Sequence, residues 1–155
     1  MNRGGNTRQS GLQLGNGPNR RPGDPIVELK TYFVEDNATI RENLIGTLEE
    51  LACVRPLGWA ETENDAKGWL AQHAGQWDLT IVDLFLKQGS GLGVLEACRD
   101  RPTGQRVVVL SNYATADMRK RCTQLGADAV FDKSNEIDAL VEYCIAQSDA
   151  PRPAA

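Results

Sequence analysis

The sequence predicts an α/β fold: a doubly wound, five-stranded parallel sheet in the order 2-1-3-4-5, with helices on both faces. Five short apolar runs alternate with five amphipathic stretches, which is the pattern of repeated strand–helix units. One run, Val54 to Ala60, contains Pro56, and proline cannot donate to a β-ladder. That strand therefore suits a sheet edge, where the flavodoxin-like order places the second strand.

The five apolar runs predict the strands. Two runs, Leu79 to Leu84 and Val107 to Leu110, are almost continuously apolar, which is typical of strands covered on both faces. The other predicted strands are Leu29 to Val34, Val54 to Ala60 and Ala129 to Phe131.

Apolar residues at helical spacing predict a helix after each strand. Thr115 can cap the fourth helix and Gly126 can end it, while Ser134 or Asn135 can cap the last one. The residues predicted to face inward are Ile40, Leu44, Ile45, Leu48 and Leu51; Ala66, Trp69 and Leu70; Val94, Leu95 and Cys98; Met118, Cys122 and Leu125; and Ile137, Leu140, Val141, Cys144 and Ile145.

Composition divides the chain into three parts. Residues 1–25 hold six glycines, three prolines and four arginines, but only two leucines as aliphatic residues. Such a segment buries too little surface to offset its ordering entropy, so it is predicted to be a disordered N-terminal extension. Residues 26–148 are predicted to form one domain, and residues 149–155 a flexible C-terminal tail.

Bulk properties exclude several classes. The net charge of −4 disfavours direct DNA binding. No apolar run reaches the roughly 18 residues of a membrane helix, and no signal peptide is recognisable, so we expect a cytoplasmic protein without membrane contact. The four cysteines lie far apart and His73 is the only histidine, which makes a Cys/His metal site a poor interpretation.

Polar residues lie at the carboxyl ends of four of the five predicted strands. Glu35 and Asp36 lie at the end of the first, Asp83 at the end of the third, Ser111 at the end of the fourth and Lys133 at the end of the fifth. The carboxyl ends of parallel strands meet at one edge, so these side chains are expected to converge. Three close carboxylates repel one another unless a cation compensates, and Mg²⁺ fits an all-oxygen site. Lysine and serine suit phosphoryl oxygens, which leaves a carboxylate as the nucleophile.

With these residues the sequence resembles the receiver domains of two-component response regulators. The resemblance covers roughly residues 28 to 147. The matching motifs are Glu35-Asp36-Asn37, Val82-Asp83-Leu84, Gly91, Ser111, and Gly126 to Lys133.

The resemblance implies a phosphorylation site. Asp83 would be the phosphoacceptor, taking its phosphoryl group from a histidine kinase or a histidine phosphotransfer protein. Ser111 and Lys133 would contact that group. The implied Mg²⁺ ligands are Glu35, Asp36, Asp83 and the backbone carbonyl of Phe85.

Two positions near the fifth strand depart from the family pattern. Val130 stands where the family usually has an aromatic switch residue. Phe131 follows it, but one step along a strand turns a side chain to the other sheet face. Ser134 replaces the usual proline after the lysine, so a trans peptide bond is expected there.

Three bulky side chains occupy positions that line access to the phosphoryl group in the family: Phe85, Asn112 and Tyr113. Bulky groups there should exclude the hydrolytic water. We therefore expect slow loss of phosphate from Asp83.

The leading hypothesis is a single-domain response regulator that signals to an unknown downstream protein, as a monomer or a weak phosphorylation-linked dimer. The alternative is a receiver-like interaction domain that does not depend on phosphorylation. An aspartate-nucleophile phosphatase would need a second acid two residues after Asp83, where Phe85 stands. We therefore expect no enzyme activity beyond the chain's own aspartyl phosphorylation and dephosphorylation.

Overall fold

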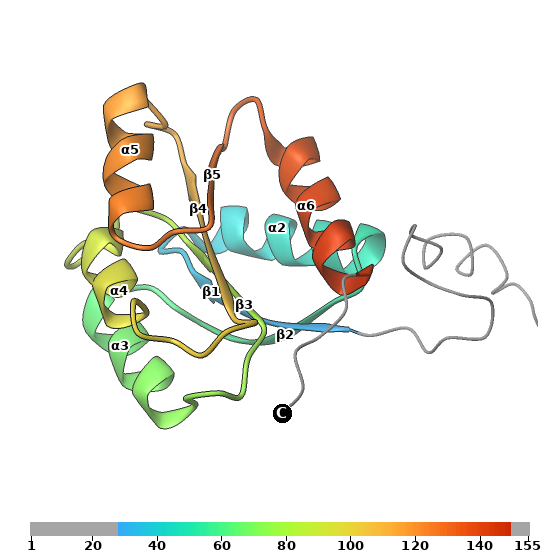
Figure 1. Cartoon of the computed structure of the whole chain (residues 1–155). Helices are drawn as coiled ribbons and strands as arrows, with labels where there is room; N and C mark the ends of the chain where they lie inside the picture. Colours follow the sequence, from blue (N-terminus) through green and yellow to red (C-terminus); the bar gives the residue numbers. More distant parts are fainter. Residues whose placement is uncertain (1–27, 150–155) are drawn as a thin grey trace, which may run out of the picture.

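The computed structural model describes residues 28–149, in which five strands alternate with five helices (Figure 1). The strands form one parallel sheet in the order β2-β1-β3-β4-β5, so the predicted fold class and strand order are confirmed. The strands are β1 Leu29–Val34, β2 Val54–Ala60, β3 Leu79–Val82, β4 Arg106–Ser111 and β5 Ala129–Asp132. The helices are α2 Ala38–Leu51, α3 Glu63–Gln72, α4 Gly91–Ala97, α5 Ala116–Gln124 and α6 Ile137–Asp149.

The predicted extension, residues 1–25, lies outside the described residues. So does the predicted C-terminal tail, except for its first residue, because α6 extends to Asp149. No helix within residues 28–149 is long and apolar enough to cross a bilayer.

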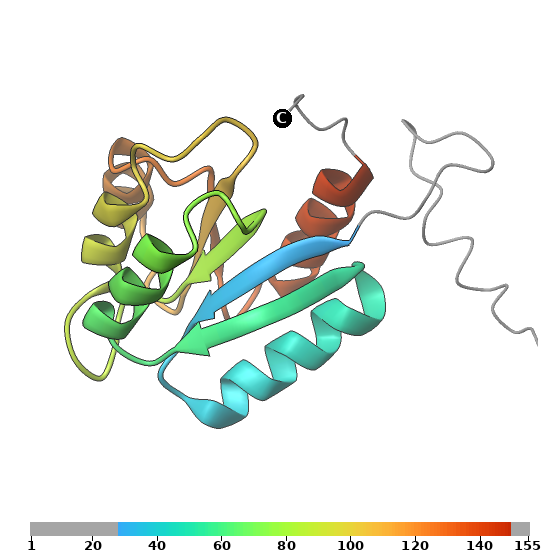
Figure 2. The ribbon, with the colours of Figure 1, turned by 90° about the horizontal axis from the view of Figure 1, so that it is seen from below.

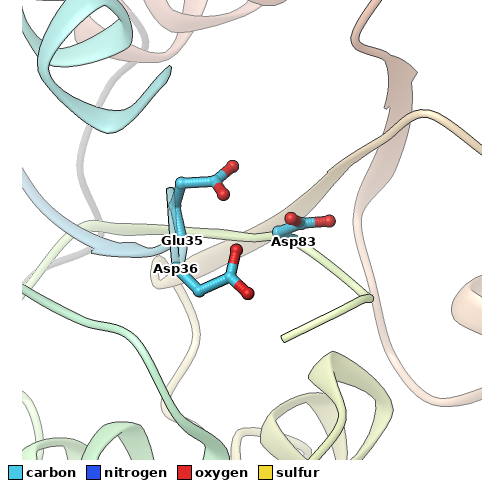
Figure 3. A group of neighbouring side chains, drawn as sticks. All are labelled: Glu35, Asp36 and Asp83. Carbon is cyan, nitrogen blue, oxygen red and sulfur yellow. The ribbon is translucent and has the colours of Figure 1, made fainter. Parts of the chain in front are cut away.

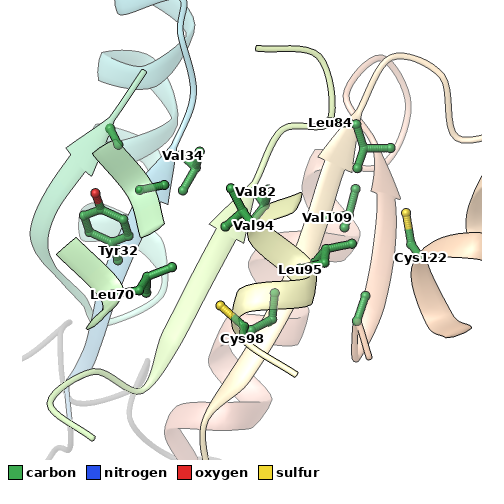
Figure 4. Close-up of a cluster of buried hydrophobic side chains, with 14 of the residues drawn as sticks. Tyr32, Val34, Leu70, Val82, Leu84, Val94, Leu95, Cys98, Val109 and Cys122 are labelled. Carbon is green, nitrogen blue, oxygen red and sulfur yellow. The ribbon is translucent and has the colours of Figure 1, made fainter. Parts of the chain in front are cut away.

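The helices cover both faces of the sheet (Figures 1 and 2). On one face α3, α4 and α5 bury a cluster with the inward side chains of the strands, part of which is drawn in Figure 4. On the other face α2 and α6 bury a second cluster that includes Leu48 and Leu140. The sheet is thus packed between two apolar layers. The ends of its strands lie outside these layers, where polar residues can be accommodated.

The edge strand has features that discourage further pairing. In β2, Pro56 pairs with Thr31 and Gly58 pairs with Tyr32, so Leu57 is an extra residue at a register shift. Proline and a bulge both interrupt an exposed ladder. The edge position predicted from Pro56 is confirmed.

Four helices are preceded by an N-cap residue, whose side chain accepts a hydrogen bond from a backbone N–H of the first turn. These caps are Asn37, Thr62, Ser90 and Thr115. The predicted cap of the last helix is wrong. Helix α6 begins at Ile137, so Glu136 is the residue that precedes it. The backbone carbonyl of Glu136 accepts a hydrogen bond from the amide of Leu140. The amide of Ser134 is instead held by Asp132 Oδ1 at 2.7 Å.

Some boundary and burial predictions are wrong in detail. The third strand ends at Val82, so Asp83 begins a loop, although its amide still donates to Val34 O. Ile40 and Leu51 are 37% and 43% exposed rather than inward. They lie in the first and last turns of α2, beyond the stretch that packs on the sheet.

Candidate functional site

Three carboxylates meet at the carboxyl ends of two neighbouring strands. Glu35 and Asp36 follow β1, and Asp83 follows β3, which pairs with β1. One oxygen of each carboxylate lies within 4.8 Å of the others, and Figure 3 shows the three side chains gathered around one space. Glu35 and Asp83 are only 3% and 7% exposed, so water cannot offset their repulsion.

Lys133 compensates part of this negative charge. Its Nζ lies 2.6 Å from Glu35 Oε1 and 3.0 Å from Asp83 Oδ2. Burial alone would lower the pKa of Lys133, but the hydrogen bonds and charges of the two carboxylates outweigh burial and raise it. The lysine therefore stays charged and bridges the strand ends.

Asp36 is the third carboxylate of the cluster and makes no ion pair with Lys133. Burial, followed by a hydrogen bond and the charge of Glu35, raises the pKa of Asp36. Ionisation of Asp36 is therefore less favourable than that of an exposed aspartate, and a bound cation would favour it. An oxygen-only donor set with excess negative charge is what Mg²⁺ requires, so the residues present fit this ion.

Gly91 allows the start of α4 to lie directly against the backbone of Asp83 and Leu84. Its amide donates to Leu84 O at 2.9 Å. A Cβ at this position would collide with the carbonyl oxygen of Asp83 and would lie 2.7 Å from the Cα of Leu84. Only glycine allows this close approach, which gives a physical reason for the glycine eight residues after Asp83.

Ser111 lies at the end of β4 and is fully buried. Its Oγ accepts from the amide of Tyr113 at 3.1 Å, and its carbonyl accepts from the amide of Lys133 at 3.0 Å. The two residues expected to contact a phosphoryl group are thus joined through the backbone.

The residues expected to line the access route lie around this site. Phe85 donates its amide to Asp83 Oδ1 at 3.3 Å. The rings of Phe85 and Tyr113 meet edge to face, with their centroids 4.9 Å apart. Asn112 lines a pocket that Lys133 also lines. Of the three, Phe85 thus contacts Asp83 directly, Tyr113 contacts Phe85 and Ser111, and Asn112 shares a pocket with Lys133.

The fifth strand presents its two central residues to opposite faces. Val130 packs against the cluster under α3, α4 and α5. Phe131 belongs to the opposite cluster and contacts the ring of Tyr143 at 5.7 Å. Phe131 therefore does not replace the aromatic switch residue. No peptide bond in residues 28–149 is cis, so the bond between Lys133 and Ser134 is trans, as expected.

An ion pair between a buried arginine and a partly exposed glutamate beside the site was missed. Arg41 is 6% exposed and donates from Nη1 to Glu35 O at 2.9 Å and to Glu61 Oε2 at 3.1 Å. Glu61 also pairs with Lys87 at 3.3 Å. Two signals were available: Glu61 directly follows the second predicted strand, and Arg41 lies three residues before Leu44 on the apolar helix face.

This geometry is that of a signalling receiver domain. The chain belongs to the response regulator receiver domain family, whose model matches residues 32–145. It is thus a receiver domain of the two-component response regulators. Domains of this family typically bind Mg²⁺ at an acidic pocket, and a buried acidic cluster is present at the corresponding place here.

Curated relatives match part of the chain. The photosynthetic apparatus regulatory protein RegA of Rhodobacter capsulatus is 29% identical over 94 residues, which are 61% of this chain and 50% of RegA. The transcriptional regulatory protein CusR of Escherichia coli K12 is 28% identical over 100 residues, which are 64% of this chain and 42% of CusR. The chain therefore spans about half the length of these relatives, or less.

Solved structures share the fold. The signal receiver domain of NarL from Mycobacterium tuberculosis has a TM-score of 0.69 at 18% identity, with 81% of this chain and 99% of that chain covered. The phosphorylated cyanobacterial phytochrome response regulator RcpA has a TM-score of 0.65 at 24% identity, with 82% and 99% covered. At these identities the likeness establishes the fold alone.

Proposed function

We propose that this receiver is switched by transfer of a phosphoryl group from a phosphohistidine to Asp83. The observation that carries the proposal is the position of Asp83, a buried carboxylate at a strand end with Lys133 Nζ at 3.0 Å. A carboxylate oxygen of Asp83 would form the new O–P bond while the P–N bond to histidine breaks. The leaving imidazole keeps the electron pair and takes up a proton.

The neighbouring side chains have separate roles in this transfer. Lys133 would move from Asp83 to a phosphoryl oxygen and offset its charge. The hydroxyl of Ser111 would donate to a second phosphoryl oxygen. Glu35, Asp36, Asp83 and the backbone carbonyl of Phe85 would hold Mg²⁺. When bound, Mg²⁺ would neutralise charge on the transferring group.

A pocket beside Lys133 supports a protein as the phosphodonor. It has a volume of about 330 Å³ and lies between α2 and α6. Its lining residues are Ile40, Asn43, Leu44, Thr47, Leu110, Asn112, Lys133 and Ile137. A mostly apolar pocket lined by Lys133, whose Nζ contacts Asp83, suits a side chain that flanks a phosphohistidine on a protein surface. We therefore propose a histidine kinase or a histidine phosphotransfer protein as the donor.

One experiment tests the acceptor directly. The protein is incubated with Mg²⁺ and acetyl phosphate, and its intact mass is measured. We expect a gain of one phosphoryl group that Asp83→Asn abolishes and that chelation of Mg²⁺ prevents. No gain at any Mg²⁺ concentration would refute the proposal and favour a receiver-like interaction domain that works without phosphorylation.

A further inference from the structure

One arginine joins three segments that meet behind the phosphorylation site. Arg119, on α5, donates from Nε to Ala114 O at 2.9 Å and from Nη1 to Val130 O at 2.9 Å. Its Nη2 donates to Glu136 Oε1 at 2.7 Å. The three acceptors belong to the loop after β4, to β5, and to the turn after β5. All three guanidinium nitrogens are therefore used within the described structure.

Glu136 connects this arginine to the turn that carries Lys133. Its Oε1 also accepts from the amide of Asp132 at 2.8 Å, and its own amide donates to Asp132 O at 2.8 Å. Hydrogen bonds from Arg119 and then from the Asp132 amide lower the pKa of Glu136. Glu136 is thus ionised at neutral pH, and its contact with Arg119 is a charge-assisted one.

The joined segments hold the two residues proposed to contact the phosphoryl group. Ala114 lies three residues after Ser111, and Glu136 lies three residues after Lys133. Movement of Ser111 or Lys133 toward a phosphoryl group would shift the loop or the turn behind it. A planar guanidinium has its donors in a fixed fork, so it cannot keep all three acceptors when their spacing changes. On this argument, phosphoryl binding would compete with the three contacts of Arg119.

We propose that Arg119 and Glu136 form a latch that stabilises the arrangement without a phosphoryl group, and that phosphorylation of Asp83 opens it. This inference rests on the function proposed above and adds a route from Asp83 to the surface of α5, β5 and α6. Within this latch, Arg119 contacts β5 through a hydrogen bond to the backbone carbonyl of Val130. It therefore does not need the aromatic side chain that this strand lacks. Arg119 is a positioning residue, because it touches neither Asp83 nor Lys133 in the contacts above.

The test uses the beryllium trifluoride anion, which mimics a phosphoryl group, together with Mg²⁺. Coupling is reciprocal, so a latch that opposes the phosphoryl state must weaken phosphoryl binding. Arg119→Lys keeps the charge but loses the fork, and should bind beryllium trifluoride about fivefold more tightly than the unmodified chain. Glu136→Gln should shift affinity in the same direction. Arg121→Lys is the matched control, since Arg121 is exposed on the same helix and takes no part in the latch.

Hydrogen exchange at the Asp132 amide gives a second measurement, because this amide donates to Glu136. Its exchange should speed up when beryllium trifluoride binds the unmodified chain, and should already be fast in Arg119→Lys without it. Equal or weaker binding by Arg119→Lys would overturn the latch, since a purely supporting role predicts no gain. If the unmodified chain itself fails to bind, the function proposed above fails, and the latch fails with it.

Discussion

The rings of Phe85 and Tyr113 contact each other edge to face across the loops that follow β3 and β4, with an interplanar angle of 67° and centroids 4.9 Å apart. Both side chains remain accessible to solvent, since Phe85 is 53% and Tyr113 is 61% exposed. Each is anchored by its backbone to a site residue, Phe85 to Asp83 and Tyr113 to Ser111. We therefore propose that the pair restricts the approach of water to a phosphoryl group on Asp83.

Removing either ring should speed the loss of phosphate. Phe85→Ala and Tyr113→Ala should each shorten the half-life of the phosphorylated protein by three- to tenfold, which corresponds to up to about 1.4 kcal/mol of activation free energy. The measurement is decay of the phosphorylated species by intact mass after removal of the donor. Leu51→Ala is the control, because Leu51 is also an exposed apolar side chain but lies in the last turn of α2. An unchanged half-life in both ring variants would show that the pair does not restrict water.

Gly91 should be irreplaceable, because an added Cβ meets backbone rather than a movable side chain. Gly91→Ala should lower the free energy of unfolding by about 1–3 kcal/mol, as overpacking does, and should slow phosphorylation by displacing Asp83. Gly46→Ala is the matched control. Nothing lies within 4 Å of a Cβ there, and alanine in a helix gains roughly 0.5–1 kcal/mol over glycine. Urea unfolding measures both, and equal stability of the two variants would contradict the close approach.

Local patterns were enough to predict the fold and the meeting of the acidic residues. The bounds of β1 and β2 are those predicted, because apolar runs and Pro56 act through local chemistry. Asp83 and Lys133 meet because parallel strands deliver their ends to one edge. These inferences need only the order of the strands and no side-chain geometry.

Contacts that depend on side-chain geometry were not predictable in the same way. Arg119 reaches Glu136 across 17 positions, and nothing in the periodicity marks either residue. Glu136 rather than Ser134 precedes α6 because of two hydrogen bonds of Asp132. Its amide donates to Glu136 Oε1, and its Oδ1 accepts from the amide of Ser134, so Ser134 belongs to a turn before the helix. In the sequence, a buried charged residue such as Arg41 is recognisable only as a charged position on an otherwise apolar helix face. That pattern does not identify the residue with which it forms an ion pair.

Removing the ammonium of Lys133 should destabilise the protein mainly when Mg²⁺ is absent. Lys133→Met would leave Glu35 and Asp83 buried without their cation, and breaking a buried pair in this way costs roughly 3 kcal/mol. Mg²⁺ should restore part of that loss and shift the variant's unfolding midpoint more than that of the unmodified chain.

Lys87→Met is the matched control for this prediction. Lys87 pairs with Glu61 at 3.3 Å, but its side chain is 58% exposed, and pairs of that kind contribute less than about 1 kcal/mol. Thermal unfolding with and without Mg²⁺ separates the two variants. An equal Mg²⁺ response in Lys133→Met and Lys87→Met would mean that Lys133 does not balance the carboxylates.

Mg²⁺ affinity should fall as the pH falls, and Asp36 should be the reason. Burial and the neighbouring Glu35 raise the pKa of Asp36, so a proton competes with the metal at a higher pH than for an ordinary aspartate, whose pKa is about 3.9. For a carboxyl group with a raised folded-state pKa, the stability contribution is present at low pH and lost as the pH rises through that pKa. Asp36→Asn should therefore be more stable than the unmodified chain at neutral pH without metal.

The same substitution should remove the pH dependence. Calorimetric Mg²⁺ titrations between about pH 5 and about pH 8 would show weaker binding toward acid for the unmodified chain, and weak, nearly flat binding for Asp36→Asn. Asp138→Asn is the control, because Asp138 is an exposed acid in the first turn of α6 and should change neither property. If Asp36→Asn keeps both its affinity and its acid sensitivity, protonation of Asp36 does not limit Mg²⁺ binding and the prediction fails.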